Sequence, residues 1–254
     1  MMNSIGLKTL VGQEIQKFLR VAVQTLVSPW INAILYIFIF GFVIGQRIDL
    51  IASVSYIEFV LPGVLMLNLI SSAFQHTAFS LYFKRFARHI EELLTAPLSN
   101  AEILIGHTLG GVTRALVVGI GVYIIALLFG AAQIVHPLWF LFYSISVAII
   151  FSLLGLLVGL WADNFEQLSI LGTFVITPLT FLGGMFNSVT MLPEKMQLIA
   201  YFNPFFYFVD GLRYSMTGIQ ESNQLIGIAI IVGLILFLGG FLWHLFNIGW
   251  RLRN

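Results

Sequence analysis

Six long apolar segments constrain the fold of this chain more than any other feature of its sequence. They cover residues 26–45, 57–81, 103–129, 138–161, 168–186 and 225–246. A helix needs about 20 residues to cross the hydrocarbon core of a bilayer, and lipid-facing backbone must form its hydrogen bonds within its own segment. The sequence therefore predicts an all-α integral membrane protein, with six transmembrane helices in one domain over residues 1–254.

Composition excludes a soluble domain and several kinds of chemistry. Hydrophobic residues make up 59% of the chain and charged residues 9%, whereas soluble domains carry about 25% charged residues. The absence of cysteine excludes disulfides, thiolate metal sites and cysteine nucleophiles. The first apolar segment is too long for a signal peptide and no small-residue cleavage site follows it, so we expect it to remain as a helix.

Positive charge predicts the orientation, because cytoplasmic loops of membrane proteins are enriched in Lys and Arg. Six spans place both termini on one side, which then holds eight basic residues against three on the other. The two sets are Lys8, Lys17, Arg20, Lys84, Arg85, Arg88, Arg251 and Arg253 against Arg47, Lys195 and Arg213. We expect both termini to be cytoplasmic. Arg114 lies within the third segment, near its cytoplasmic start; a side chain that snorkels to the interface is favoured there over a residue of a transport pathway.

The N-terminal residues 1–24 predict an amphipathic helix at the cytoplasmic interface rather than a span. Its apolar residues recur at helical spacing, and its polar residues fall on the other face. The two sets are Leu7, Leu10, Val11, Ile15 and Phe18 against Gln13, Gln16 and Lys17.

A charged island separates the second and third segments: five of the 23 charged residues lie within residues 84–92. The pattern predicts a cytoplasmic helix over residues 82–98, with Arg88 and Glu92 one turn apart and Pro97 at its end. Ser99 and Glu102 then form the capping box of the next helix. An ordinary solvated loop helix fits equally well. The predicted apolar face consists of Phe86, Ile90, Leu93 and Leu94.

Residues 187–204 predict short re-entrant helices between the fifth and sixth spans. Gly183 and Gly184, Pro193 and Pro204 all interrupt helices, and broken backbone at membrane depth must be buried in protein or line a cavity. A plain extracellular loop is the alternative. The aromatic residues Phe181 and Phe186 and the aromatic run at residues 205–208 are expected to form an interfacial belt, ahead of contact with substrate.

The sequence lacks the common signatures of an enzyme or of an independent pump. It has no P-loop and no nucleophile elbow, and its five histidines show no metal-ligand spacing; His76 and His107 are expected to pack between helices. An ion-coupled carrier would place carboxylates near the midplane, but Glu58 lies near the outer end of its segment. The chain either conducts passively, as an ATP-independent carrier or channel, or takes its energy from a partner.

The chain resembles the membrane subunits of ABC-2 type exporters, in the short bacterial form without large external domains. The resemblance rests on the island FARHIEELLTAPL (86–98), followed in order by TPLTFLGG (177–184), LP (192–193), NP (203–204) and GLRY (211–214). It implies a permease subunit in the bacterial inner membrane that moves an amphiphilic, lipid-linked, saccharide or drug-like substrate outward.

The resemblance also implies partners and site residues. Two copies would form a homodimer in membrane lipid, and each would dock a cytoplasmic ABC ATPase that binds ATP and Mg²⁺; the chain itself would hold no cofactor or metal and bind no nucleic acid. The implied coupling residues are Arg85, Arg88, His89, Glu91, Glu92 and Leu93. The implied residues of the outer gate are Phe181, Gly183, Gly184, Phe186, Pro193, Asn203, Pro204 and Arg213.

Overall fold

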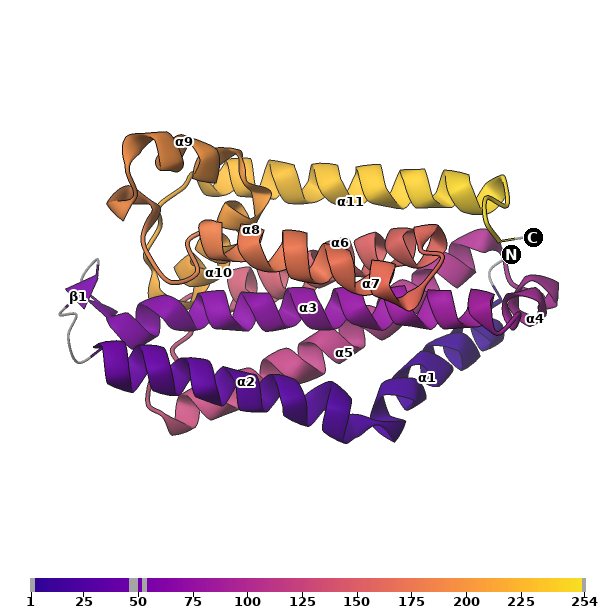
Figure 1. Cartoon of the computed structure of the whole chain (residues 1–254), viewed down its shortest axis with the longest axis horizontal. Helices are drawn as coiled ribbons and strands as arrows, with labels where there is room; N and C mark the ends of the chain where they lie inside the picture. Colours follow the sequence, from indigo (N-terminus) through magenta and orange to yellow (C-terminus); the bar gives the residue numbers. More distant parts are fainter. Residues whose placement is uncertain (1–2, 46–49, 52–53, 253–254) are drawn as a thin grey trace.

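The computed structural model describes residues 3–45, 50–51 and 54–252 of the chain (Figure 1). The chain begins with α1 (Ser4–Arg20) and α2 (Ser28–Tyr36), and two short antiparallel strands follow, β1 (Leu50–Ile51) and β2 (Val54–Ser55). The remaining helices are α3 (Tyr56–Phe86), α4 (Ile90–Thr95), α5 (Asn100–Leu128), α6 (Pro137–Trp161), α7 (Phe165–Leu171), α8 (Thr177–Leu182), α9 (Glu194–Phe202), α10 (Pro204–Thr217) and α11 (Gln224–Asn247).

Six helical segments of the described chain are long and apolar enough to cross a membrane, which confirms the predicted all-α membrane fold. They are Val23–Gly41, Tyr56–Phe86, Asn100–Leu128, Pro137–Trp161, Phe165–Leu182 and Gln224–Asn247. The second is longer than predicted, because α3 continues beyond the apolar segment to Phe86.

Two of these segments contain π-helical turns, and a proline closely follows two of the turns, whereas the turn Ile37–Ile44 has no proline beside it. The turns Val23–Val27 and Gly172–Ile176 directly precede α2 and α8, which carry Pro29 and Pro178 in their first turns. A proline inside a helix removes a donor and its ring crowds the carbonyl four residues earlier. Local widening to a π-turn relieves that clash without ending the segment.

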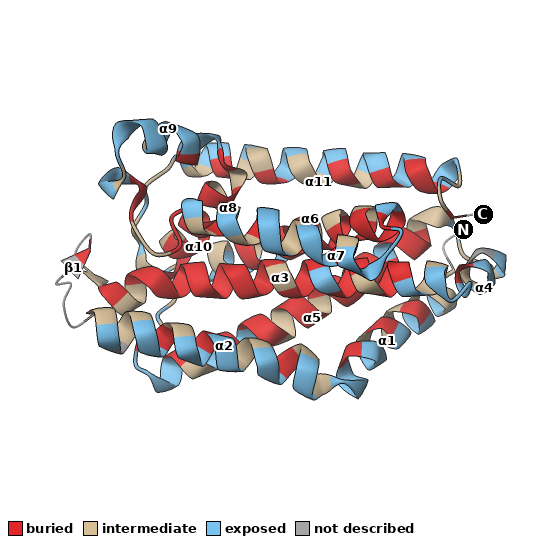
Figure 2. Ribbon diagram, viewed as in Figure 1, coloured by how far each residue is buried: buried red, intermediate tan, exposed pale blue. Residues whose placement is uncertain are grey.

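Helix α3 is the centre of the molecule (Figure 2). The most apolar part of α3 is 83% buried, against 17% for the segment that contains α2 and 22% for α11. Gly155 and Gly159 of α6 allow close packing, since a Cβ at Gly155 would lie 2.4 Å from the carbonyl oxygen of Phe74. The Thr77 hydroxyl also donates to the Ser152 carbonyl at 2.8 Å. Small residues four apart are typical of closely packed membrane helices.

Both ends of the described chain lie with α4 at one end of the bundle, whereas β1 and α9 lie at the other (Figure 1). The Asn3 side chain donates to the Pro97 carbonyl at 3.0 Å, and Arg85 Nε donates to the Arg251 carbonyl at 3.0 Å. This places both ends of the described chain on the same side of the six spans. Arg47 and Arg253, which contribute to the charge count above, lie outside the described residues.

Candidate functional site

The charged island is not the single helix that the sequence predicts. Helix α3 runs through Phe86, the chain turns, and α4 begins only at Ile90. Arg88 stops the helix because its φ is +58°, a left-handed conformation that is uncommon for residues other than glycine. Phe86 and Ile90 therefore do not share a helical face: Phe86 is 66% exposed and Ile90 is 6% exposed. The side chain of Leu94 lies outside what the structure describes.

The predicted coupling residues fall into two groups. Four of them are exposed on the turn and on α4, namely Arg88, His89, Glu91 and Glu92, and Leu93 is half-buried. No ion pair joins Arg88 to Glu92 within the described chain.

Arg85 has a different place from the other predicted coupling residues. Its Nη1 donates to the carbonyls of Gly159 at 2.9 Å and Ala162 at 3.2 Å, in addition to the bond from its Nε to Arg251. Arg85 therefore joins the end of α3 to the end of α6 and to the C-terminal segment through its Nε and Nη1.

The start of α5 fixes the C-terminal end of the segment that connects α3 to α5 through α4. The predicted capping box is confirmed: the Ser99 amide donates to Glu102 Oε2 at 2.7 Å, and the Glu102 amide donates to Ser99 Oγ at 3.3 Å. The amide of Asn3 also donates to Glu102, which is 2% exposed. The beginning of the chain and the start of α5 are thus joined at one carboxylate.

A buried ionic cluster lies behind this connection, and the sequence patterns did not predict it. Its centre is Glu14 of α1, which is completely buried. The Glu14 carboxylate lies 2.6 Å from Lys17 Nζ and 3.2 Å from Lys84 Nζ, and it accepts a hydrogen bond from Ser80 Oγ at 2.6 Å. The network thus joins α1 to the last turns of α3.

Two histidines complete the cluster. His76 Nε2 lies 3.3 Å and His107 Nδ1 lies 3.4 Å from the Glu14 carboxylate, so both histidines pack between helices, as predicted, but against a charge. Burial alone would raise the pKa of Glu14, but its contacts with His107, His76 and Lys84 outweigh burial and lower the pKa below its ordinary value. Glu14 is therefore ionised at neutral pH.

Glycines allow α1 to approach closely enough to bury Glu14. A Cβ at Gly110 would lie 2.5 Å from Glu14 Cβ, and a Cβ at Gly106 would lie 2.5 Å from a terminal methyl group of Leu10. In the sequence, Glu14 lies four residues from Leu10 and from Phe18, both of which are buried. A carboxylate on the apolar face of a predicted helix was the signal that could have revealed the cluster.

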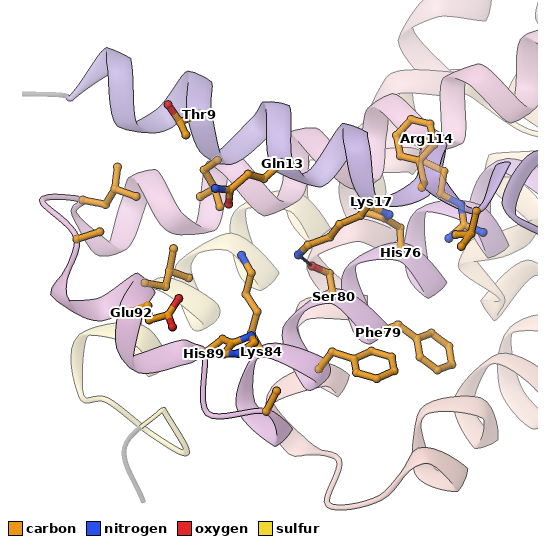
Figure 3. A pocket seen from close by; sticks show the side chains of 18 of the residues that line it. Thr9, Gln13, Lys17, His76, Phe79, Ser80, Lys84, His89, Glu92 and Arg114 are labelled. Carbon is orange, nitrogen blue, oxygen red and sulfur yellow. Dashed lines mark hydrogen bonds between the residues drawn. The ribbon is translucent and has the colours of Figure 1, made fainter.

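Beside the cluster lies a cleft of about 1080 Å³ between α1, α3 and α4 (Figure 3). Polar side chains line much of it, and Figure 3 shows Arg114 at one end and His89 and Glu92 at the other. Arg114, predicted to snorkel to the interface, lines the cleft; its side chain is 9% exposed and its Nε is buried without a hydrogen-bond partner. The residues labelled in the figure are Thr9, Gln13, Lys17, His76, Phe79, Ser80, Lys84, His89, Glu92 and Arg114.

At the opposite end of the bundle, the fifth span ends at Leu182 and a compact region of short helices follows. Gly184 has φ +83°, and a 3₁₀ turn (Val189–Met191), α9 and α10 come next. Pro193 precedes α9 and Pro204 is the first residue of α10, positions at which a missing amide hydrogen costs little.

Asn203 and Arg213 hold this region together. Asn203 Nδ2 donates to the Leu179 carbonyl at 2.6 Å, and its Oδ1 accepts from the Phe205 amide at 3.0 Å. Arg213 is fully buried; it donates to the carbonyls of Gly184 and Phe59, and its guanidinium carbon lies 3.8 Å from the centre of the Phe59 ring. The predicted gate residues therefore tie α8 and α10 to the start of α3.

The aromatic residues of α8, of the turn after it and of α10 pack inward, whereas Phe202 of α9 is 82% exposed. Phe186 stacks on Phe40 with 4.1 Å between ring centres, and Phe181 lies 5.1 Å from Phe186. Phe205, Phe206 and Phe208 are at most 6% exposed, and Tyr207 is half-buried. The predicted interfacial belt is therefore wrong, because α10 packs against α3 and α6 and its aromatic side chains fill the core.

Two further features bear on the chemistry of the chain. The carboxylate of Glu58 is engaged in hydrogen bonds at the start of α3, where it accepts from the Ser55 amide at 3.0 Å and from Gln133 Nε2 at 3.0 Å. Among residues 3–45, 50–51 and 54–252, no three His, Asp or Glu side chains are arranged to hold a metal ion.

Comparison with known proteins gives a consistent result. The model of the ABC-2 type transporter family matches residues 6–217. The inner membrane transport permease YadH of Escherichia coli K12 is 39% identical over 250 residues, which cover 98% of each chain. Nodulation protein J of Rhizobium leguminosarum bv. viciae is 25% identical over 213 residues, or 84% of this chain and 82% of the relative.

Proposed function

The chain belongs to the ABC-2 type transporter family and is a multi-pass inner-membrane transport permease, and from this premise we propose that it is the membrane subunit of an ATP-driven exporter. A separate cytoplasmic ABC ATPase would bind ATP and Mg²⁺ and supply the energy. The permease would move an amphiphilic, lipid-linked, saccharide or drug-like substrate outward.

The observation that carries this proposal is the way in which α4 is mounted. Glu91 and Glu92 are exposed, whereas Ile90 on the same short helix is buried. Arg85 and the Ser99–Glu102 capping box fix the chain on both sides of α4. A conformational change can be passed on only through an element that does not bend, and α4 combines exposed charge with a fixed base.

The excess of Lys and Arg on the side of the termini supports a cytoplasmic location for α4, where ATP is present. The opposite end supports an outer gate, since broken helices and a buried arginine close the bundle there. We expect two copies to form the complete pathway, each with one ATPase.

Reversal of charge on α4 tests the coupling. The permease is reconstituted in vesicles with an ABC ATPase from the same genome, and Glu91→Lys and Glu92→Lys are compared with the parent. We expect ATP-dependent transport to fall at least about tenfold, as when one partner of a charge pair at an interface is reversed, with normal membrane insertion. Glu166→Lys, at the exposed start of α7, is the matched control and should transport normally.

Two outcomes would contradict the proposal. Undiminished transport by both α4 variants would remove the role of α4 in coupling. Movement of substrate by the permease alone, without ATP or ATPase, would favour the carrier or channel instead.

A further inference from the structure

Arg114 is a buried cation without a counter-charge. Its side chain is 9% exposed and its Nε is buried without a hydrogen-bond partner. Within the described chain it forms no ion pair, whereas Lys17 and Lys84 share the Glu14 carboxylate. Buried charges in proteins are normally paired, above all at membrane depth. The arrangement therefore calls for an anion that comes from outside the chain.

The depth of Arg114 makes this requirement stronger. Arg114 lies fourteen residues after the first residue of α5, which is about 21 Å along the helix axis. Gln24 and Gln75 line the same cleft, are exposed, and form no side-chain hydrogen bond with another described residue. Polar and ionisable side chains within membrane segments almost always face the interior of the bundle or a water-filled cavity.

The distribution of charge along the cleft favours an anion at the deep end. Glu92 is the one carboxylate among the described residues that line the cleft, and it lies at the end opposite Arg114 (Figure 3). Glu14 lies behind the wall of the cleft, where Lys17 and Lys84 contact it. An anionic group near Arg114 would thus meet a cation, in a cleft that is also lined by two amides and whose one lining carboxylate lies at the other end.

Part of the wall is apolar. Phe18, Val21, Phe79 and Phe83 line the cleft, and Phe83 is 50% exposed. The cleft has a volume of about 1080 Å³, which is at the upper end of the range for small-molecule sites. A purely hydrophilic anion would leave this aromatic wall uncovered, whereas an anion with a hydrocarbon chain would satisfy both parts of the cleft.

We propose that the cleft between α1, α3 and α4 binds an anionic amphiphile, with Arg114 as the principal contact of its phosphate or carboxylate and the phenylalanine wall as the contact of its chain. The proposal that the cleft is a binding site is argued from its geometry alone and does not depend on the proposed function. That such amphiphiles are the transported class rests on the proposed function.

Binding can be measured on the full-length purified chain without ATPase or transport, so a failure here is distinct from a failure of the exporter proposal. The chain in the neutral detergent dodecyl maltoside is titrated with dodecyl phosphate, and the midpoint of thermal unfolding is followed. We expect a saturable rise. In Arg114→Gln, the mole fraction of dodecyl phosphate that gives half the rise should increase about tenfold or more, as for the loss of a charge-assisted hydrogen bond.

Matched controls separate the site from general surface charge. Arg20→Gln removes an exposed cation of α1 that does not line the cleft and should bind within about twofold of the parent. Arg114→Lys keeps the charge and should recover part of the affinity. In the absence of ligand, Arg114→Gln should unfold at the same temperature as the parent or higher, because the variant loses a charge that has no partner.

Several results would overturn the proposal. Unchanged binding of dodecyl phosphate by Arg114→Gln would remove Arg114 from the site. An equal response to inorganic phosphate would show that the hydrocarbon chain is not needed for binding. An equal response to dodecyltrimethylammonium would show that the negative charge is not needed. A lower unfolding temperature of ligand-free Arg114→Gln, with unchanged binding, would instead assign Arg114 to a contact with a second protein chain.

Discussion

At the scale of single residues, the carboxylate of Glu14 takes part in more ion pairs than any other carboxylate among the described residues. It is completely buried, and it is in contact with Lys17 and Lys84 and with two histidines. Without it, the ammonium group of Lys84, whose side chain is 13% exposed, would remain beside α1 with no counter-charge. The carboxylate thus permits an amphipathic helix to pack against two spans that carry basic side chains.

Replacement of Glu14 by Gln is therefore expected to be costly. Loss of one partner of a buried ion pair destabilises a protein by about 3–5 kcal/mol, and we expect the midpoint of thermal unfolding in detergent at pH 7 to fall accordingly. Glu166→Gln, at an exposed position, is the control and should change the free energy of unfolding by less than about 0.5 kcal/mol.

The pH dependence provides a second measurement of the same network. The neighbours of Glu14 lower its pKa in the folded protein, so its contribution to stability is present above the ordinary pKa of about 4.5 and is lost only as the pH falls further. The difference in stability between the parent and Glu14→Gln should therefore not shrink between pH 8 and pH 5. Equal stability of parent and variant, or a difference that disappears at pH 5, would contradict the assigned role.

At the scale of elements, the turn after α8 depends on a backbone conformation that favours glycine. Gly184 adopts φ +83°, and its carbonyl accepts a hydrogen bond from the buried Arg213. The nearest atom to a Cβ at this position would be the Asn187 carbonyl oxygen at 3.3 Å. The conformation, more than the space, requires glycine there.

Gly184→Ala should consequently destabilise the protein by about 1–2 kcal/mol, the cost of a left-handed conformation for a residue with a Cβ. The measurement is the midpoint of thermal unfolding. Gly233→Ala is the matched control, because Gly233 lies within α11 and a Cβ there would meet no described atom within 4 Å; alanine should be neutral there or stabilise α11 by up to about 1 kcal/mol. If both variants behave alike, the turn does not depend on its glycine.

The elements also show what could be read from the sequence. The six spans were predictable because each is a local property, the length of an apolar run, and the Ser99–Glu102 capping box because its partners lie three residues apart. The break in the helix at Arg88 was not predictable, since the left-handed backbone conformation of an arginine does not alter the hydrophobic periodicity of the sequence. The Glu14 cluster joins residues more than 60 positions apart, so it depends on how helices pack and not on any one of them.

At the scale of the whole molecule, burial is distributed from the centre outward. Helix α3 is enclosed, whereas α2 and α11 expose large apolar side chains such as Leu35, at 51%, and Phe237, at 66%. Such faces require lipid or a second copy of the chain around them. The polar ends remain free to face water: α4 and both described termini at one end, and α9 at the other (Figure 1).

Which end faces the cytoplasm is open to a direct measurement, because the chain contains no cysteine and a single introduced thiol gives a signal without background. Glu91→Cys and Lys195→Cys place that thiol at exposed positions of α4 and α9, whereas position 90 is buried and would give a weak signal from either side. With the positive-inside orientation, a membrane-impermeant maleimide should label position 195 in intact spheroplasts, and position 91 only in inverted vesicles. The reverse pattern would place α4 outside the cell, where no ATPase could reach it, and the exporter proposal would fall with the orientation. The expected pattern would leave α4 as the exposed, rigidly held element on the side where ATP is made available, which is the condition that coupling requires.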